Sequence, residues 1–240
     1  MNVQQHGTNL ITLTKFTAFN CFLVREDDGF TLVDTGMSGS ETAILQAAQA
    51  HGVEIKRILL THAHVDHVGS LDALAAALPD VPVIISEREA RLLAGDMSID
   101  ADEPQTAPKG GFPDVTTRAT QTVTHGDRVG SLEVVAAPGH TPGHIALLDT
   151  RDNTLLAGDA FVVRGGFAVS GVFKLFFPFP AFATWHKPTA LNSAKALRAL
   201  NPSRIAVGHG KVLENPAAMM DAAIREAEKS FGVNPAQAMS

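Results

Sequence analysis

The 240-residue sequence lacks the groups that stabilise secreted proteins and those that anchor proteins in membranes. It has no tyrosine and a single cysteine, Cys21, so an internal disulfide is excluded. It has no apolar run long enough to cross a bilayer. Its N-terminus lacks the charged and apolar regions of a secretory signal. We therefore expect a cytoplasmic protein with no membrane partner, in which Cys21 is a small buried hydrophobe.

The balance of charge excludes a second class of partner. Nineteen Lys and Arg residues against 25 Asp and Glu give a formal net charge of −6, so there is no basic surface for nucleic acid. The apolar fraction of 45% and the charged fraction of 18% are ordinary for a soluble globular protein. We expect a single domain over residues 1–240, with halves at about 1–115 and 116–240.

Apolar periodicity predicts short strands that alternate with helices. Predicted strands are 10–13, 18–25, 30–33, 57–60, 81–86, 121–123, 132–136, 145–148, 155–157 and 205–207. Predicted helices are 40–51, 68–78, 87–94, 189–200 and 217–229. Between them, the polar segment 95–120 is too long for an ordinary connection, so it is either functional or mobile. His6 is expected in a frayed end.

A cluster of histidines directly follows the strand 57–60. His62, His64, Asp66 and His67 lie within six consecutive positions. His62 and His64 are two residues apart, so in an extended segment both side chains point the same way and can bind one metal ion. Asp66 and His67 follow at a turn and are free to face elsewhere. Imidazole with a carboxylate suits zinc, and also iron, cobalt or manganese; the alternative is a polar loop that happens to be rich in histidine.

Three further candidates share one context. His140, Asp159 and His209 each follow an apolar strand, and each has glycine immediately before it. Glycine permits close approach of the backbone at a crowded site. Singly, each of these residues is also compatible with a simple turn. His144 is expected to support the site or the core rather than to bind metal.

The stretch from His62 to His67 resembles the His-x-His-x-Asp-His signature of the metallo-β-lactamase superfamily, and Asp34-Thr35-Gly36 resembles a second motif of that family. The resemblance implies an α/β fold, the αββα four-layer sandwich, with two facing mixed β-sheets and helices outside. It also implies two divalent metal ions, zinc first, with iron, manganese or cobalt as alternatives. The implied ligands are His62, His64 and His140 for the first ion, Asp66, His67 and His209 for the second, and Asp159 as the bridge. Asp34 is expected to support the metal loop from behind, or to serve only its turn.

The resemblance implies a hydrolase in which a metal-bound hydroxide attacks a carbonyl carbon, with Asp66 as the catalytic proton carrier. Typical zinc β-lactamases lack the bridging aspartate, so Asp159 disfavours that activity. Typical lactonases have a tyrosine just beyond this aspartate, where the present sequence has Val162. A lactone or ester with an apolar group is the preferred substrate. The alternatives are a glyoxalase-II-like thioesterase, a β-lactamase, a mononuclear-iron sulfur dioxygenase and a non-catalytic metal-binding module.

The segment 161–182 carries seven of the 13 phenylalanines and directly follows Asp159. Part of it should therefore lie near the site. The residues expected to bind substrate are Phe173, Phe176, Phe177, Phe179 and His186, as an apolar wall with one polar group. The alternatives for this segment are core packing and the contact surface of a homodimer.

Overall fold

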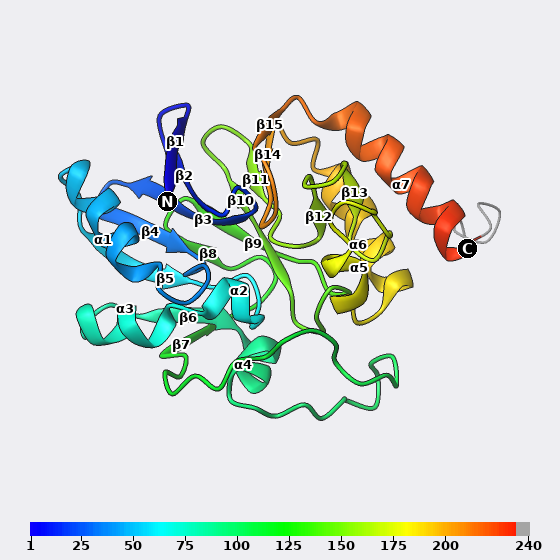
Figure 1. The fold of residues 1–240 in the computed structure, drawn as a ribbon, viewed down its shortest axis with the longest axis horizontal. Helices are drawn as coiled ribbons and strands as arrows, with labels where there is room; N and C mark the ends of the chain where they lie inside the picture. The colour runs from blue at the N-terminus through cyan, green and yellow to red at the C-terminus, as the bar shows by residue number, and fades with distance from the viewer. Residues whose placement is uncertain (234–240) are drawn as a thin grey trace.

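The computed structural model describes residues 1–233 and contains two β-sheets that face each other (Figure 1). The first sheet contains seven strands that follow the order of the chain. They are β1 (Asn2–His6), β2 (Leu10–Lys15), β3 (Phe19–Glu26), β4 (Gly29–Val33), β5 (Ile55–Leu59), β6 (Val83–Ser86) and β7 (Gln121–Val123). The strands β1 to β4 pair antiparallel, whereas β4 to β7 pair parallel. This sheet is therefore mixed.

The second sheet contains six strands in the spatial order β15-β14-β11-β10-β9-β8. They are β8 (Arg128–Val129), β9 (Leu132–Ala136), β10 (Ile145–Asp149), β11 (Thr154–Leu156), β14 (Arg204–Ala206) and β15 (Leu213–Glu214). Two short strands, β12 (Phe161–Val162) and β13 (Ala168–Val169), pair separately. Because β11 runs parallel to β14 and β10 runs antiparallel to both β9 and β11, the strands β9, β11 and β14 all point the same way.

Helices cover the outer side of each sheet. Figure 1 shows α1 and α3 on one side of the molecule and α6 and α7 on the other. The helices are α1 (Glu41–Ala50), α2 (Val65–Val68), α3 (Leu71–Ala77), α4 (Glu87–Leu93), α5 (Phe179–Ala183), α6 (Lys187–Ala199) and α7 (Ala217–Phe231). Within residues 1–233, no helix combines the length and the apolar character needed to cross a membrane.

Within residues 1–233, three large buried clusters fill the spaces between these layers. One lies between α1, α3, α4 and the first sheet and includes Ile44, Leu74 and Leu32. A second joins the two sheets, with Phe22 of β3 in the same cluster as Leu147 of β10. The third lies between the second sheet and the helices α6 and α7. Three apolar layers between four structural layers confirm the predicted αββα sandwich.

Two local predictions need correction. His6 is not in a frayed end: it is the last residue of β1, paired with Leu10 of β2. The helix predicted over 68–78 is α3, from Leu71 to Ala77, and Val68 instead ends the separate helix α2; between them, Ser70 lies outside the helical region with φ −105° and ψ 12°. Asp66 and His67 therefore lie on the short helix α2 and not on α3. The segment 95–120 contains neither helix nor strand.

Candidate metal centre

The seven residues predicted as ligands come together at one edge of the sandwich. His62 follows β5, His140 follows β9, Asp159 follows β11 and His209 follows β14. Because β9, β11 and β14 point the same way, their carboxyl ends deliver side chains to the same edge. Three groups have ligand atoms within 4.8 Å of one another. These groups are His62, His64 and His140; His62, His67 and Asp159; and Asp66, His67 and His209.

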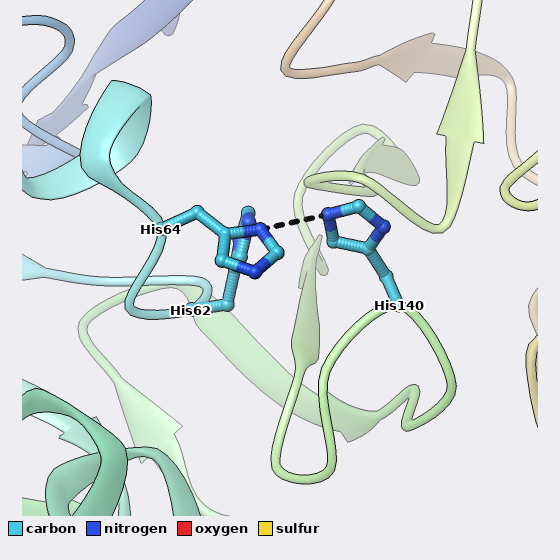
Figure 2. A group of neighbouring side chains, drawn as sticks. All are labelled: His62, His64 and His140. Carbon is cyan, nitrogen blue, oxygen red and sulfur yellow. Dashed lines mark hydrogen bonds between the residues drawn. The ribbon is translucent and has the colours of Figure 1, made fainter. Parts of the chain in front are cut away.

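The first group is made of three buried imidazoles. His64 Nδ1 lies 3.0 Å from His140 Nε2, and Figure 2 shows these rings facing each other beside His62. His64 Nε2 is held by the backbone oxygen of Lys109 at 2.8 Å, so Nδ1 is the nitrogen left to face the group. Thus part of the segment 95–120 has a defined place: it holds His64 from outside.

The other four histidines are also fixed through the ring nitrogen that points away from the cluster. His62 Nδ1 lies 3.0 Å from Thr61 Oγ1, and His140 Nδ1 lies 2.8 Å from Ser170 Oγ. His67 Nδ1 lies 2.8 Å from Asp34 Oδ2, and His209 Nδ1 lies 3.3 Å from the oxygen of Ala18. In each ring the second nitrogen, Nε2, is therefore free to face inward. Such outer partners set the tautomer and orientation of histidines that bind metals.

Asp159 lies between the groups. Its Oδ2 is 2.9 Å from His209 Nε2 and 3.4 Å from His140 Nε2, whereas its Oδ1 is 3.4 Å from His67 Nε2. One carboxylate thus faces histidines of both outer groups, the position predicted for a bridge. Asp66 Oδ2 lies 3.3 Å from His209 Nε2, and the Asp66 side chain is 21% exposed. Of the two carboxylates, Asp66 is the one with access to solvent.

The cluster fits a metal ion because several of its buried nitrogen and oxygen atoms are unpaired. His62 Nε2, His67 Nε2 and Asp159 Oδ1 are buried and have no hydrogen-bond partner within residues 1–233. Buried polar atoms are normally paired, so three unpaired polar atoms in one buried cluster indicate a binding site for an ion. The atoms available to bind a metal are nitrogen and oxygen, which suits zinc, iron, manganese and cobalt alike.

The Cys21 thiol is buried elsewhere, with its Sγ 3.9 Å from the oxygen of Leu13, and burial raises its pKa.

The charges of the cluster also favour a bound metal ion. Burial, together with repulsion from neighbouring histidines, holds the pKa of His62 and His140 well below the usual range, so these rings are neutral and able to coordinate. Burial also acts to lower the pKa of His209, but Asp159 and Asp66 outweigh it and raise that pKa to about 9. The carboxylates therefore draw positive charge into the site. A divalent cation supplies that charge when the protons leave.

Asp34 supports the cluster from below. It is 1% exposed, and besides facing His67 it accepts hydrogen bonds from the backbone N–H and the hydroxyl of Thr61, both at 2.8 Å. Its φ of +58° is a left-handed conformation that aspartate tolerates better than most residues. One carboxylate thus ties the end of β4 to the loop that begins at Thr61.

Close backbone approach is required at Gly208. A Cβ atom there would lie 2.2 Å from Asp159 Oδ1 and 2.6 Å from His67 Cε1. The glycine before His209 is therefore needed for space. Asn20, which the sequence did not single out, holds the same segment: its Nδ2 donates to the oxygens of Val207 at 2.8 Å and Gly210 at 2.6 Å.

A cavity of about 530 Å³ opens onto the cluster. Its apolar side is formed by Phe19, Phe177, Phe179 and Phe182. Phe177 is 8% exposed, and its ring centroid lies 5.1 Å from that of His209, whereas Phe179 and Phe182 are 67% and 68% exposed. Phe182 was not among the residues predicted to touch substrate. Its place in the sequence does not reveal that it lies on the short helix α5 and faces the cavity.

Other predicted residues lie outside this cavity. Phe173 and Phe176 are exposed but do not line it. His186 caps the N-terminus of α6, with Nδ1 2.7 Å from Thr189 Oγ1, and it is not a lining residue either. His144 Nε2 accepts a hydrogen bond from the backbone N–H of Asp159 at 2.9 Å. His144 is therefore behind the cluster, as expected from the sequence.

Comparisons with known proteins place the chain in a family. A family model described as the metallo-beta-lactamase superfamily matches residues 16–209. The uncharacterized protein YobT of Bacillus subtilis (strain 168) is 51% identical over 233 residues, which are 95% of this chain and 100% of YobT. The probable metallo-hydrolase YflN of the same organism is 30% identical over 226 residues, which are 85% of this chain and 84% of YflN.

Solved structures agree with this placement. The crystal structure of TTHA1623 in a di-iron-bound form is 27% identical, with a TM-score of 0.65, and the match covers 88% of this chain and 97% of that one. The chain described here therefore belongs to the metallo-beta-lactamase superfamily, among its metallo-hydrolases.

Proposed function

We propose that this chain is a dinuclear metal-dependent hydrolase that acts on a small carbonyl substrate, with a lactone or ester carrying an apolar group preferred. The observation that carries the proposal is the set of seven donors arranged in overlapping groups around Asp159, with unpaired buried atoms facing inward. His62, His64 and His140 would hold one ion and Asp66, His67 and His209 the other. When bound, such ions lower the pKa of water and polarise a carbonyl oxygen.

Asp66 is the residue placed to handle the proton. It lines the cavity, and its carboxylate is partly exposed, so it can accept a hydrogen bond from an attacking water and orient it. Burial acts to raise the pKa of Asp66, but His67 and His209 hold it well below its usual range, so the group is ionised at neutral pH. The proton taken up at the Asp66 carboxylate can then pass to the leaving oxygen.

The lining of the cavity supports an apolar substrate. The four phenylalanines form one side, and within residues 1–233 no Lys or Arg contributes to the lining. A charged substrate such as a glutathione thioester would need placed partners for its charges, because an unpaired charge is costly to bury. Apolar groups need only area, at about 25 cal/mol per Å². The thioesterase is therefore the second candidate rather than the first.

Two measurements test the proposal together. Elemental analysis of protein purified without chelator should approach two metal equivalents per chain and name the metal. Zinc is proposed first, and the di-iron form of TTHA1623 makes iron the main alternative. A hydrolysis screen of lactones, aryl esters, thioesters and β-lactams on metal-replete protein should show the highest kcat/KM for apolar lactones or esters. One firmly bound equivalent with oxygen uptake would favour the dioxygenase instead, and two equivalents with no turnover would favour the binding module.

A further inference from the structure

A buried carboxylate that the proposed reaction does not use lies behind the first group of histidines. Glu89 is on α4, its side chain is fully buried, and it is not a lining residue of the cavity. It has no direct access to a substrate. Burying a carboxylate is unfavourable unless its oxygens are paired, so its contacts indicate what it does.

Each oxygen of Glu89 binds a different loop of the site. Oε2 accepts a hydrogen bond from the backbone N–H of Ala63 at 2.9 Å, and Ala63 stands between His62 and His64. Oε1 accepts one from the backbone N–H of Gly143 at 2.8 Å, in the turn that begins with His140. A single side chain therefore joins the two loops that supply all three histidines of the first group.

We propose that Glu89 is a positioning residue that sets the separation of these two loops, and with it the geometry of the first metal site. The inference rests on the proposed metal function. A carboxyl group suits this role because it offers two oxygens in a fixed plane, one for each of the two N–H groups. An amide at this place keeps only one acceptor, so one of the two loops loses its partner.

The start of α4 strengthens the same connection. Ser86 Oγ donates to the oxygen of Gly143 at 2.6 Å and accepts from the backbone N–H of Glu89 at 3.2 Å. A Cβ atom at Gly143 would lie 2.7 Å from the Glu89 nitrogen, so the turn is packed directly against the helix. By contrast, within residues 1–233 Glu89 makes no side-chain hydrogen bond to the helix α2, which carries Asp66 and His67, or to the segment of His209. The effect should therefore fall on one metal site and spare the other.

The experiment compares metal affinities of wild type and Glu89→Gln, measured by titrating apoprotein with zinc against a chromophoric chelator. His140→Ala and His209→Ala identify which of the two binding events belongs to which group. Glu89→Gln should weaken the event lost in His140→Ala by about 10–100-fold, and leave the other unchanged. The matched control is Asp149→Asn, because Asp149 is also a buried carboxylate but is bonded to Arg151 at the far end of β10. It should lower the melting temperature of the apoprotein without changing either affinity.

Each outcome bears on the proposal. Unchanged affinities in Glu89→Gln, or an equal loss at both sites that follows the melting temperature, would overturn the positioning role while leaving the proposed function intact. A wild-type protein that binds none of zinc, iron, manganese or cobalt would overturn the proposed function itself. If Glu89→Gln does not fold, Ser86→Ala tests the same connection. It should weaken the same binding event by a smaller factor, and no change there would overturn the proposal.

Discussion

The carboxylate of Asp34 lies 2.8 Å from Nδ1 of His67 and binds both the backbone N–H and the hydroxyl of Thr61. Asp34→Asn keeps the size of the side chain but replaces one acceptor by an N–H₂ donor. The outer partner of His67 is then lost or reversed, so the ring orientation and tautomer are no longer fixed. We expect metal affinity to fall by about 10–100-fold, as measured by zinc titration of the apoprotein against a chelator.

The matched control for Asp34 is Asp28→Asn. Asp28 is an exposed carboxylate in the turn between β3 and β4, where it pairs with Arg57. Asp28→Asn should leave the metal affinity unchanged, because an exposed ion pair contributes little to the stability of the fold. An Asp34→Asn protein with wild-type affinity would show that Asp34 serves only its turn.

The second prediction concerns the pH dependence of the apoprotein. Asp159 and Asp66 raise the pKa of His209 to about 9, against 6.5 for an ordinary histidine. A raised folded pKa stabilises the fold fully below pH 6.5, and this contribution is lost as the pH rises through 9. From pH 6.5 to pH 9.5 the free energy of unfolding of chelator-treated protein should therefore fall by up to about 3 kcal/mol through this group.

Urea unfolding at the two pH values measures this change. In His209→Gln the dependence on pH across this window should be smaller, whereas His125→Gln, at a histidine in the exposed turn before β8, should behave as wild type. Identical pH dependence in wild type and His209→Gln would refute the prediction.

The sequence predicted the strands that position the site because the patterns that indicate them are local in the chain. The strands that end before His62, His140, Asp159 and His209 are short apolar runs, and the glycine before each of the last three indicates a crowded site. The strand β1 was missed because its residues Asn2 to His6 are mostly polar and exposed, so it lies at the edge without the alternation that marks a half-buried strand. Pairing with β2, which is not local, is what makes it a strand.

The residues that the sequence did not reveal act through the fold. Glu89 reads as an ordinary glutamate in the first turn of a helix, and Asn20 as a polar residue in a strand. Their roles follow from contacts with Gly143 and Val207, which are distant in sequence. The place of Gly110 is likewise visible only once the long segment is folded over His64.

Gly110 gives the third prediction. Its φ is +98°, and a Cβ atom there would lie 2.3 Å from His64 Nε2. Gly110→Ala must therefore displace either the loop or the His64 ring, which loses its bond to the oxygen of Lys109. We expect zinc affinity to fall about tenfold or more. The neighbouring change Gly111→Ala is the control, because its Cβ atom would meet only Val65 Cγ1 at 3.3 Å; equal effects of the two changes would contradict this account of the loop.

The last prediction concerns the apolar side of the cavity. Phe179 and Phe182 line it and are mostly exposed, so either can be removed at little cost to the fold. Covering such a side chain with substrate is worth up to about 1.5–3 kcal/mol, or about ten- to a hundredfold in specificity. Phe179→Ala and Phe182→Ala should therefore lower kcat/KM for long acyl groups by about tenfold or more, with short acyl groups and the melting temperature little changed.

Phe176 provides the control for this wall. It is 85% exposed and lies in the same segment, but it does not line the cavity. Phe176→Ala should keep the preference for acyl length. If the outer part of the segment is a homodimer contact, this variant should instead lower the mass of the protein in solution, because an exposed aromatic patch is typical of such contacts. Equal losses on short and long substrates in Phe179→Ala and Phe182→Ala would show that these rings do not bind the acyl group, since a wall that contacts only the distal part of a chain cannot affect substrates too short to reach it.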